Sequence, residues 1–202
     1  MKPPISERIV RPQECVIAFA IPTSDETFKN HLRLKRDFAS MYRNPGRYRE
    51  HVARVYKSVE PAFRKLGVQV REEVTLQQFG QLFSGEFDVV ILFAHWRRGA
   101  VEFDEGFADV SSIVAEIPCD FNGLLDLCVC HPKELVIGLA QERLNLLTKF
   151  LDTKQATPRF WLYFYLALFT HLRDKDLTYL RGVEDVFREF LKRMKSGRRA
   201  RS

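Results

Sequence analysis

The sequence is poor in cysteine and contains no long hydrophobic run. Only four of its 202 residues are cysteine, and the longest uninterrupted apolar stretch, 160–169, has ten residues. Ten apolar residues are too few to span a bilayer, and residues 1–8 have no apolar region of the kind found in secretory signals. We therefore expect a cytoplasmic protein with reduced thiols and no membrane partner.

A disordered or low-complexity composition is also absent. Hydrophobic residues make up 46% of the chain and charged residues 29%, which is typical of a globular domain with its own core. The length favours one domain. We expect that domain over 15–191, preceded by an N-terminal extension, 1–14, and followed by a flexible basic tail, 192–202.

The formal net charge of +6 does not by itself indicate a nucleic-acid-binding protein. The excess lies in 192–202, which contains six basic residues and no acidic one, so the rest of the chain is formally neutral. A basic terminus can contact phosphates without specificity. We expect contact with nucleic acid only in that non-specific form.

Short apolar runs alternate with amphipathic segments along the chain. Runs that are apolar throughout are typical of strands buried on both faces, so the pattern predicts an α/β domain with a mainly parallel sheet flanked by helices. The two strongest runs, 87–94 and 124–129, are expected to be parallel neighbours. The predicted strands are 16–21, 68–74, 87–94 and 124–129, and the predicted helices are 26–43, 52–66, 76–83, 110–117 and most of 133–195.

Two reactive side chains follow these two strongest strands. His95 comes directly after 87–94, and Cys130 comes directly after 124–129, 35 residues further along the chain. The carboxyl ends of parallel neighbours meet at one edge of the sheet, where reactive groups collect. An imidazole can take the proton of a thiol, and the thiolate can then attack a carbonyl carbon. The pattern indicates a Cys/His pair for nucleophilic catalysis.

The residues around this pair resemble the caspase-like cysteine peptidases, and most closely their bacterial CHAT branch. In that family a His ends one strand and a Cys ends the next, and Phe-Ala-His-Trp at 93–96 and Leu-Cys-Val-Cys at 127–130 match these two motifs. Residues 101–106 look like the apolar hairpin of the family with its acidic-Gly turn, and 160–165 look like its aromatic helix.

This resemblance implies a three-layer caspase-like fold and a hydrolase, namely a cysteine endopeptidase. Cys130 would be the nucleophile and His95 the general acid/base. The resemblance also implies a protein substrate, a protein regulator of cleavage, a setting such as bacterial defence, and chemistry without a cofactor or metal.

The sequence departs from the family pattern next to the His. The family has a Gly there, whose N–H serves the oxyanion hole, whereas Trp96 brings the N–H together with a large indole. This departure leaves open a catalytically silent, caspase-like interaction module. Relatives that cleave after basic residues often have an acid two positions before the Cys. That position is Cys128 here, which we expect in the pocket wall, and Asp126, on the same strand face, is expected below the substrate pocket.

Structural roles compete with these catalytic ones. Cys130 alone fits a buried thiol, and His95 alone fits a strand-end residue that caps backbone carbonyls. Cys15 and Cys119 are expected to be structural. The Cys and His residues within 119–131 do not have the spacing of a common structural zinc site, since Cys-x-Cys on one strand face gives poor tetrahedral geometry.

Overall fold

The structure of the chain is a computed structural model in which most of the sequence is described. The predicted helix 26–43 lies almost entirely outside the described residues. The described residues are 3–24, 26–27, 45–97, 99–129, 132–143, 146–150 and 158–199.

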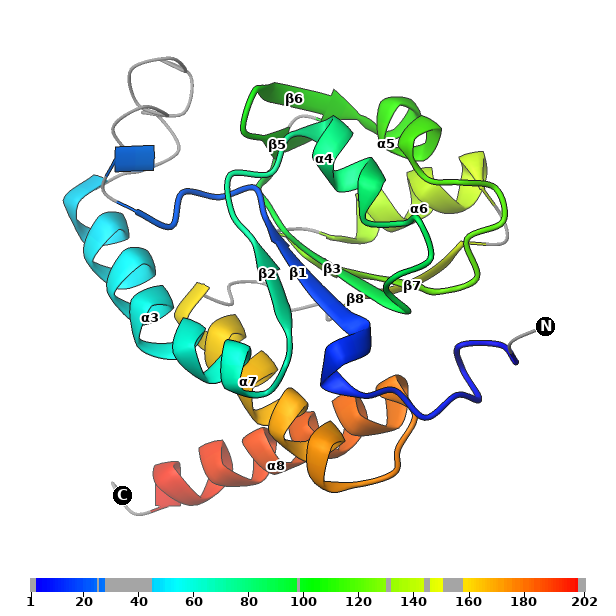
Figure 1. The fold of residues 1–202 in the computed structure, drawn as a ribbon. Coiled ribbons are helices and arrows are strands. Elements are labelled where there is room, and N and C mark those ends of the chain that lie inside the picture. The colour runs from blue at the N-terminus through cyan, green and yellow to red at the C-terminus, as the bar shows by residue number, and fades with distance from the viewer. Residues whose placement is uncertain are drawn as a thin grey trace.

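A five-stranded parallel sheet forms the centre of the molecule (Figure 1). The predicted strands 87–94 and 124–129 are confirmed as parallel neighbours, in register from Val89↔Leu124 to Phe93↔Cys128. The predicted strand 16–21 is confirmed in the same sheet. In spatial order the strands are β2 (Gln69–Arg71), β1 (Cys15–Phe19), β3 (Val89–Phe93), β7 (Leu124–Cys128) and β8 (Leu147–Phe150).

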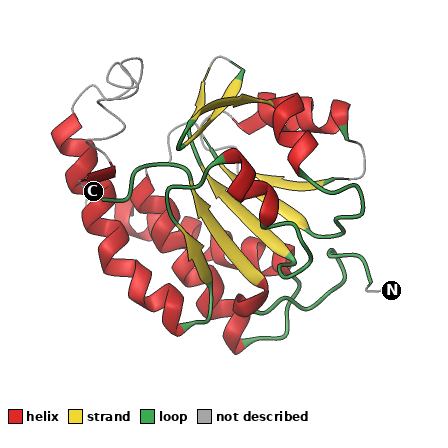
Figure 2. Cartoon of the chain, turned by 45° about the horizontal axis from the view of Figure 1, so that its top comes forward, coloured by secondary structure: helices red, strands yellow, loops and turns green. Residues whose placement is uncertain are grey.

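Helices cover both faces of the sheet, as the α/β prediction requires (Figures 1 and 2). One layer contains α3 (Pro45–Lys65) and α7 (Pro158–Asp174), with α8 (Tyr179–Arg199) against α7. The other layer contains α4 (Leu76–Gln81), α5 (Val110–Glu116) and α6 (Pro132–Glu142). A short 3-10 helix, η1 (Pro12–Glu14), precedes β1.

The side chains of successive strand residues point into two separate apolar cores, one on each face of the sheet. Ile17 and Ile91 face α3 and α7, whereas Val16 and Val90 face the layer of α4, α5 and α6. This alternation follows from the two-residue period of a strand. Because both faces are covered, every residue of β1, β3 and β7 is buried, which explains why their sequence is apolar almost throughout.

The prediction of a mostly helical segment 133–195 is confirmed by α6, α7 and α8, with one exception. That segment contains strand β8, which is only four residues long and includes Thr148 and Lys149. A short edge strand with polar residues has no apolar run by which it can be recognised. Pro61 lies inside α3 without ending it, and α8 continues through residues 192–199 of the expected tail.

Part of the N-terminal segment before β1 belongs to the fold. Ile5 and Val10, which lie in the expected extension 1–14, are buried, and both belong to the core under α7. Val10 donates a backbone hydrogen bond to Leu177, just after α7.

No helix among the described residues is long and apolar enough to cross a membrane.

Candidate functional site

A small antiparallel sheet stands beyond the carboxyl ends of the central strands (Figure 1). It consists of β4 (Trp96–Arg97), β5 (Ala100–Phe103) and β6 (Gly106–Asp109), in that order. The predicted hairpin with a turn at 104–106 is thereby confirmed, since Phe103 pairs with Gly106. The chain enters this small sheet directly from β3, through Ala94 and His95.

His95 is half-buried at the junction between β3 and β4. Its carbonyl oxygen accepts a hydrogen bond of 2.9 Å from the backbone N–H of Glu102. The last register pair of β3 and β7 is Phe93↔Cys128, and His95 and Cys130 each stand two residues beyond it. Cys130 and His131 themselves lie outside the described residues.

The indole of Trp96 is buried, with 8% of the residue exposed. It belongs to the core on the α6 side of the sheet, and its N–H donates a hydrogen bond of 3.3 Å to the carboxylate of Glu134 in the first turn of α6. The large side chain that stands where the family pattern has a Gly is therefore accommodated inside the protein.

Cys128 is 5% exposed and belongs to the core between the sheet and α7. Cys15 is fully buried in the same core. Burial is the main cause that raises the pKa of its thiol well above the usual range, and the charge of Glu14 adds to it. A thiol held in its neutral form is a poor nucleophile. Cys119 is the exposed thiol among the described cysteines.

Asp126 has no exposed surface, and it shares a face of β7 with Leu124 and Cys128, which belong to the core on the α7 side. Lys149 of β8 donates hydrogen bonds of 2.9 and 2.8 Å to its two oxygens, and the hydroxyl of Tyr179 donates one of 2.6 Å. A basic group of a substrate would have to displace Lys149 to reach this carboxylate. In the structure Asp126 is a core residue that joins β7, β8 and α8.

The same cluster perturbs two neighbouring tyrosines. Burial, and then the charge of Asp126, raises the pKa of both Tyr165 and Tyr179 well above the usual range. Lys149 lies 5.4 Å from the centre of the Tyr165 ring and 5.5 Å from that of Phe164, so aromatic faces share in stabilising its charge.

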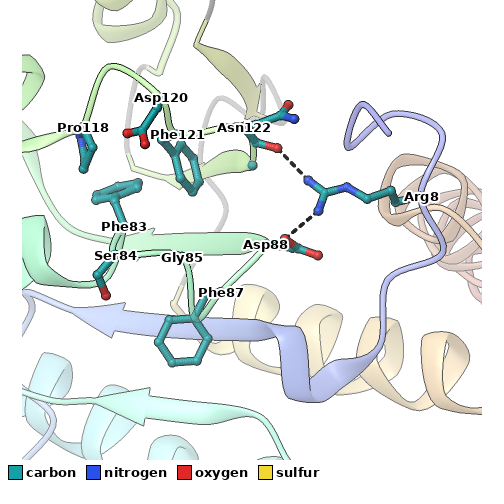
Figure 3. Close-up of a pocket in the computed structure, with 11 residues that line it drawn as sticks. Arg8, Phe83, Ser84, Gly85, Phe87, Asp88, Pro118, Asp120, Phe121 and Asn122 are labelled. Atoms are coloured by element: carbon teal, nitrogen blue, oxygen red, sulfur yellow. Dashed lines mark hydrogen bonds and ion pairs between the residues drawn. The ribbon is translucent and has the colours of Figure 1, made fainter. Parts of the chain in front are cut away.

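A cavity of about 390 Å³ lies at the opposite end of the sheet (Figure 3). Its walls come from the loops that precede β3 and β7, and include Phe83, Phe87 and Phe121. The guanidinium of Arg8 closes one end, with hydrogen bonds of 2.7 Å to Asp88 and 2.6 Å to the carbonyl of Asn122. Because it lies at the amino ends of the strands, this cavity is separate from the site around His95.

Sequence reasoning missed Glu102, which is a fully buried acid next to His95 in space. The signal was Gly99 between them, since glycine favours a chain reversal, and the pairing of Arg97 with Ala100 puts residues 95 and 102 opposite each other. Gly99 has φ +79°, a conformation that favours glycine.

A scan against models of known protein families finds no match for the chain, and a search of curated proteins finds no similar one. Among the described residues, no group of three His, Cys, Asp or Glu side chains is placed to hold a metal ion.

Proposed function

We propose that the chain is a cysteine endopeptidase of the caspase/CHAT type that cleaves a protein partner in the cytoplasm. Cys130 is the nucleophile, His95 is the general acid/base, and a partner protein regulates cleavage. The observation that carries this proposal is the register Phe93↔Cys128. It brings two adjacent parallel strands to the same level, two residues before the His and the Cys.

The proposed reaction needs only these two side chains and backbone donors. His95 takes the proton of the Cys130 thiol, and the thiolate forms a bond to the carbonyl carbon of the scissile peptide. The tetrahedral intermediate collapses as the C–N bond breaks and His95 gives the proton to the leaving amine. Water, deprotonated by His95, then hydrolyses the thioester and releases the thiol and a carboxylic acid.

Two described features support the proposed chemistry, one for the thiol at position 130 and one for the oxyanion donor. Helix α6 begins at Pro132, and the partial positive charge of a helix N-terminus favours a thiolate. The burial of the Trp96 indole against α6 means that this ring does not need to occupy substrate space. The backbone N–H of residue 96 therefore stays compatible with an oxyanion donor.

The test is competitive labelling of the native chain with iodoacetamide, with each thiol quantified by mass spectrometry. We expect Cys130 to react faster than the exposed Cys119, and His95→Ala to lower the rate at Cys130 while leaving Cys119 unchanged. If Cys130 reacts no faster than Cys119, and His95→Ala has no effect with the regulator present or absent, the peptidase proposal fails. A silent interaction module would then replace it.

A further inference from the structure

A second cavity, of about 420 Å³, lies between the end of α7 and the second half of α8. Basic side chains outnumber acidic ones on its walls. The basic ones are Lys175, Arg188, Lys192 and Arg193, and the acidic ones are Asp185 and Glu189. This α7–α8 cavity therefore has a formal excess of positive charge, which favours a negatively charged ligand.

The arginines near the cavity are balanced by acids of the same helix. Glu184 lies 3.1 Å from Arg181 and 2.5 Å from Arg188. Asp185 lies 3.5 Å from Arg181 and 3.6 Å from Arg188. Two acids thus face two arginines, and this part of α8 contributes no net charge to the cavity.

The positive excess comes from two lysines. Arg193 lies 3.6 Å from Glu189, whereas the ammonium groups of Lys175 and Lys192 form no ion pair with any residue that the structure describes. Both lysines are exposed, so each remains charged and accessible. Two unpaired ammonium groups on one concave wall are suited to contact phosphate oxygens.

The positive charge continues beyond the cavity along the chain. Helix α8 runs from the cavity to Arg199, and residues 192–202 contain six basic residues and no acidic one. Such a series of cations fits a ligand with regularly repeated negative charges better than a single anion. The cavity wall also includes Ala167, Val186 and Phe190, and apolar surface beside cations suits the sugars and bases between successive phosphates.

We propose that the α7–α8 cavity is a docking site for the phosphate backbone of a nucleic-acid strand, with Lys175 and Lys192 as its main contacts. The basic residues of 192–202 extend this contact. Because the site offers charges but no set of base-reading groups, binding depends strongly on salt and little on base sequence. This inference goes beyond the proposed peptidase activity and does not depend on it.

The experiment measures binding of a fluorescein-labelled oligothymidylate to the full chain by fluorescence anisotropy at several salt concentrations. We expect Lys175→Gln/Lys192→Gln to weaken binding several-fold at low salt and to reduce the salt dependence by about two phosphate contacts. Lys57→Gln/Lys133→Gln is the matched control. It changes the net charge equally at two exposed lysines outside the cavity, and it should leave the salt dependence nearly unchanged.

Three results would overturn the proposal. Equal losses in the two double variants would mean that the strand responds to net charge or to the basic terminus alone. Equally tight binding of polyglutamate of the same length would indicate an acidic protein segment as the ligand. Displacement of the oligothymidylate by inorganic phosphate at the same total phosphate concentration would indicate a site for free phosphate.

Discussion

Asp126 and Lys149 are buried charged residues and direct register partners on β7 and β8. Taking two charges out of water is costly, and only close mutual contact offsets the cost. Here Lys149 contacts both carboxylate oxygens, and Tyr179 donates to one of them. The pair thus ties the edge strand β8 to the sheet in one register and holds the start of α8 against it.

Removing one partner should cost more than removing both. We expect Lys149→Met to lower the free energy of unfolding by about 3–5 kcal/mol, because it leaves the Asp126 carboxylate buried without its cationic partner. The double variant Lys149→Met/Asp126→Leu should recover part of this loss. Urea unfolding of the wild type, of the single variants Lys149→Met and Asp126→Leu, and of the double variant measures the difference. A double variant that loses the sum of both single losses would contradict a coupled pair.

The raised pKa values of Tyr165 and Tyr179 predict a limit to alkaline stability. Both groups are neutral in folded and unfolded chains below about pH 10, the ordinary tyrosine value. Above it the unfolded chain loses protons that the folded one keeps, so stability is fully present below that pH and falls as pH rises. Urea unfolding across this range should show a plateau and then a decline. Tyrosinate absorbance from these two residues in folded protein near pH 10 would refute this.

At the scale of elements, the sequence is most informative where a strand is buried on both faces. The runs 87–94 and 124–129 predict their strands and their pairing, because both sheet faces exclude polar residues. Strand β8 cannot be predicted in this way. Its register depends on the pairing of Lys149 with Asp126, and this pairing is visible only in the three-dimensional structure. The candidate site is likewise only partly predictable from the sequence. The position of His95 is predicted because it follows a buried strand, but the position of Glu102 beside it is known only from the register of β4 and β5.

Helix α4 begins with a capping box that links it to the small sheet. The Thr75 side chain accepts from Gln78 N–H, the Gln78 side chain accepts from Thr75 N–H, and Glu105 accepts from Leu76 N–H. We expect Thr75→Ala to cost about 1 kcal/mol of stability, whereas Thr75→Ser, which keeps the hydroxyl, costs less. Chemical unfolding of the two variants tests this. Equal losses would mean that the hydroxyl does not act as a cap.

At the scale of the whole molecule, the N-terminal segment closes the amino end of the sheet. Arg8 joins the residue before β3 to the loop before β7 (Figure 3), and Arg11 forms an ion pair with Asp176 beyond α7. Two layers and the sheet are thereby connected by residues that precede the first strand. Composition alone does not reveal this, because 3–14 contains no run typical of a strand or a long helix.

The two arginines should contribute unequally. Arg8→Met leaves the nearly buried carboxylate of Asp88 without its guanidinium, and we expect a loss of about 3 kcal/mol. Arg11→Met is the matched control, since its ion pair is exposed to solvent and should be worth less than about 1 kcal/mol. Thermal and urea unfolding compare them. Similar losses for the two variants would show that the buried Arg8–Asp88 ion pair contributes no more stability than the exposed pair of Arg11 with Asp176.

The central claim is that His95 activates Cys130, and the dependence of Cys130 alkylation on pH tests it most directly. In the wild type the rate should reach half its maximum below about pH 8.5, the ordinary value of a cysteine thiol, because a protonated imidazole stabilises the thiolate. In His95→Ala the midpoint should move up toward that value. A wild-type midpoint at or above about pH 8.5, with the same curve in His95→Ala, would contradict the pairing of His95 with Cys130.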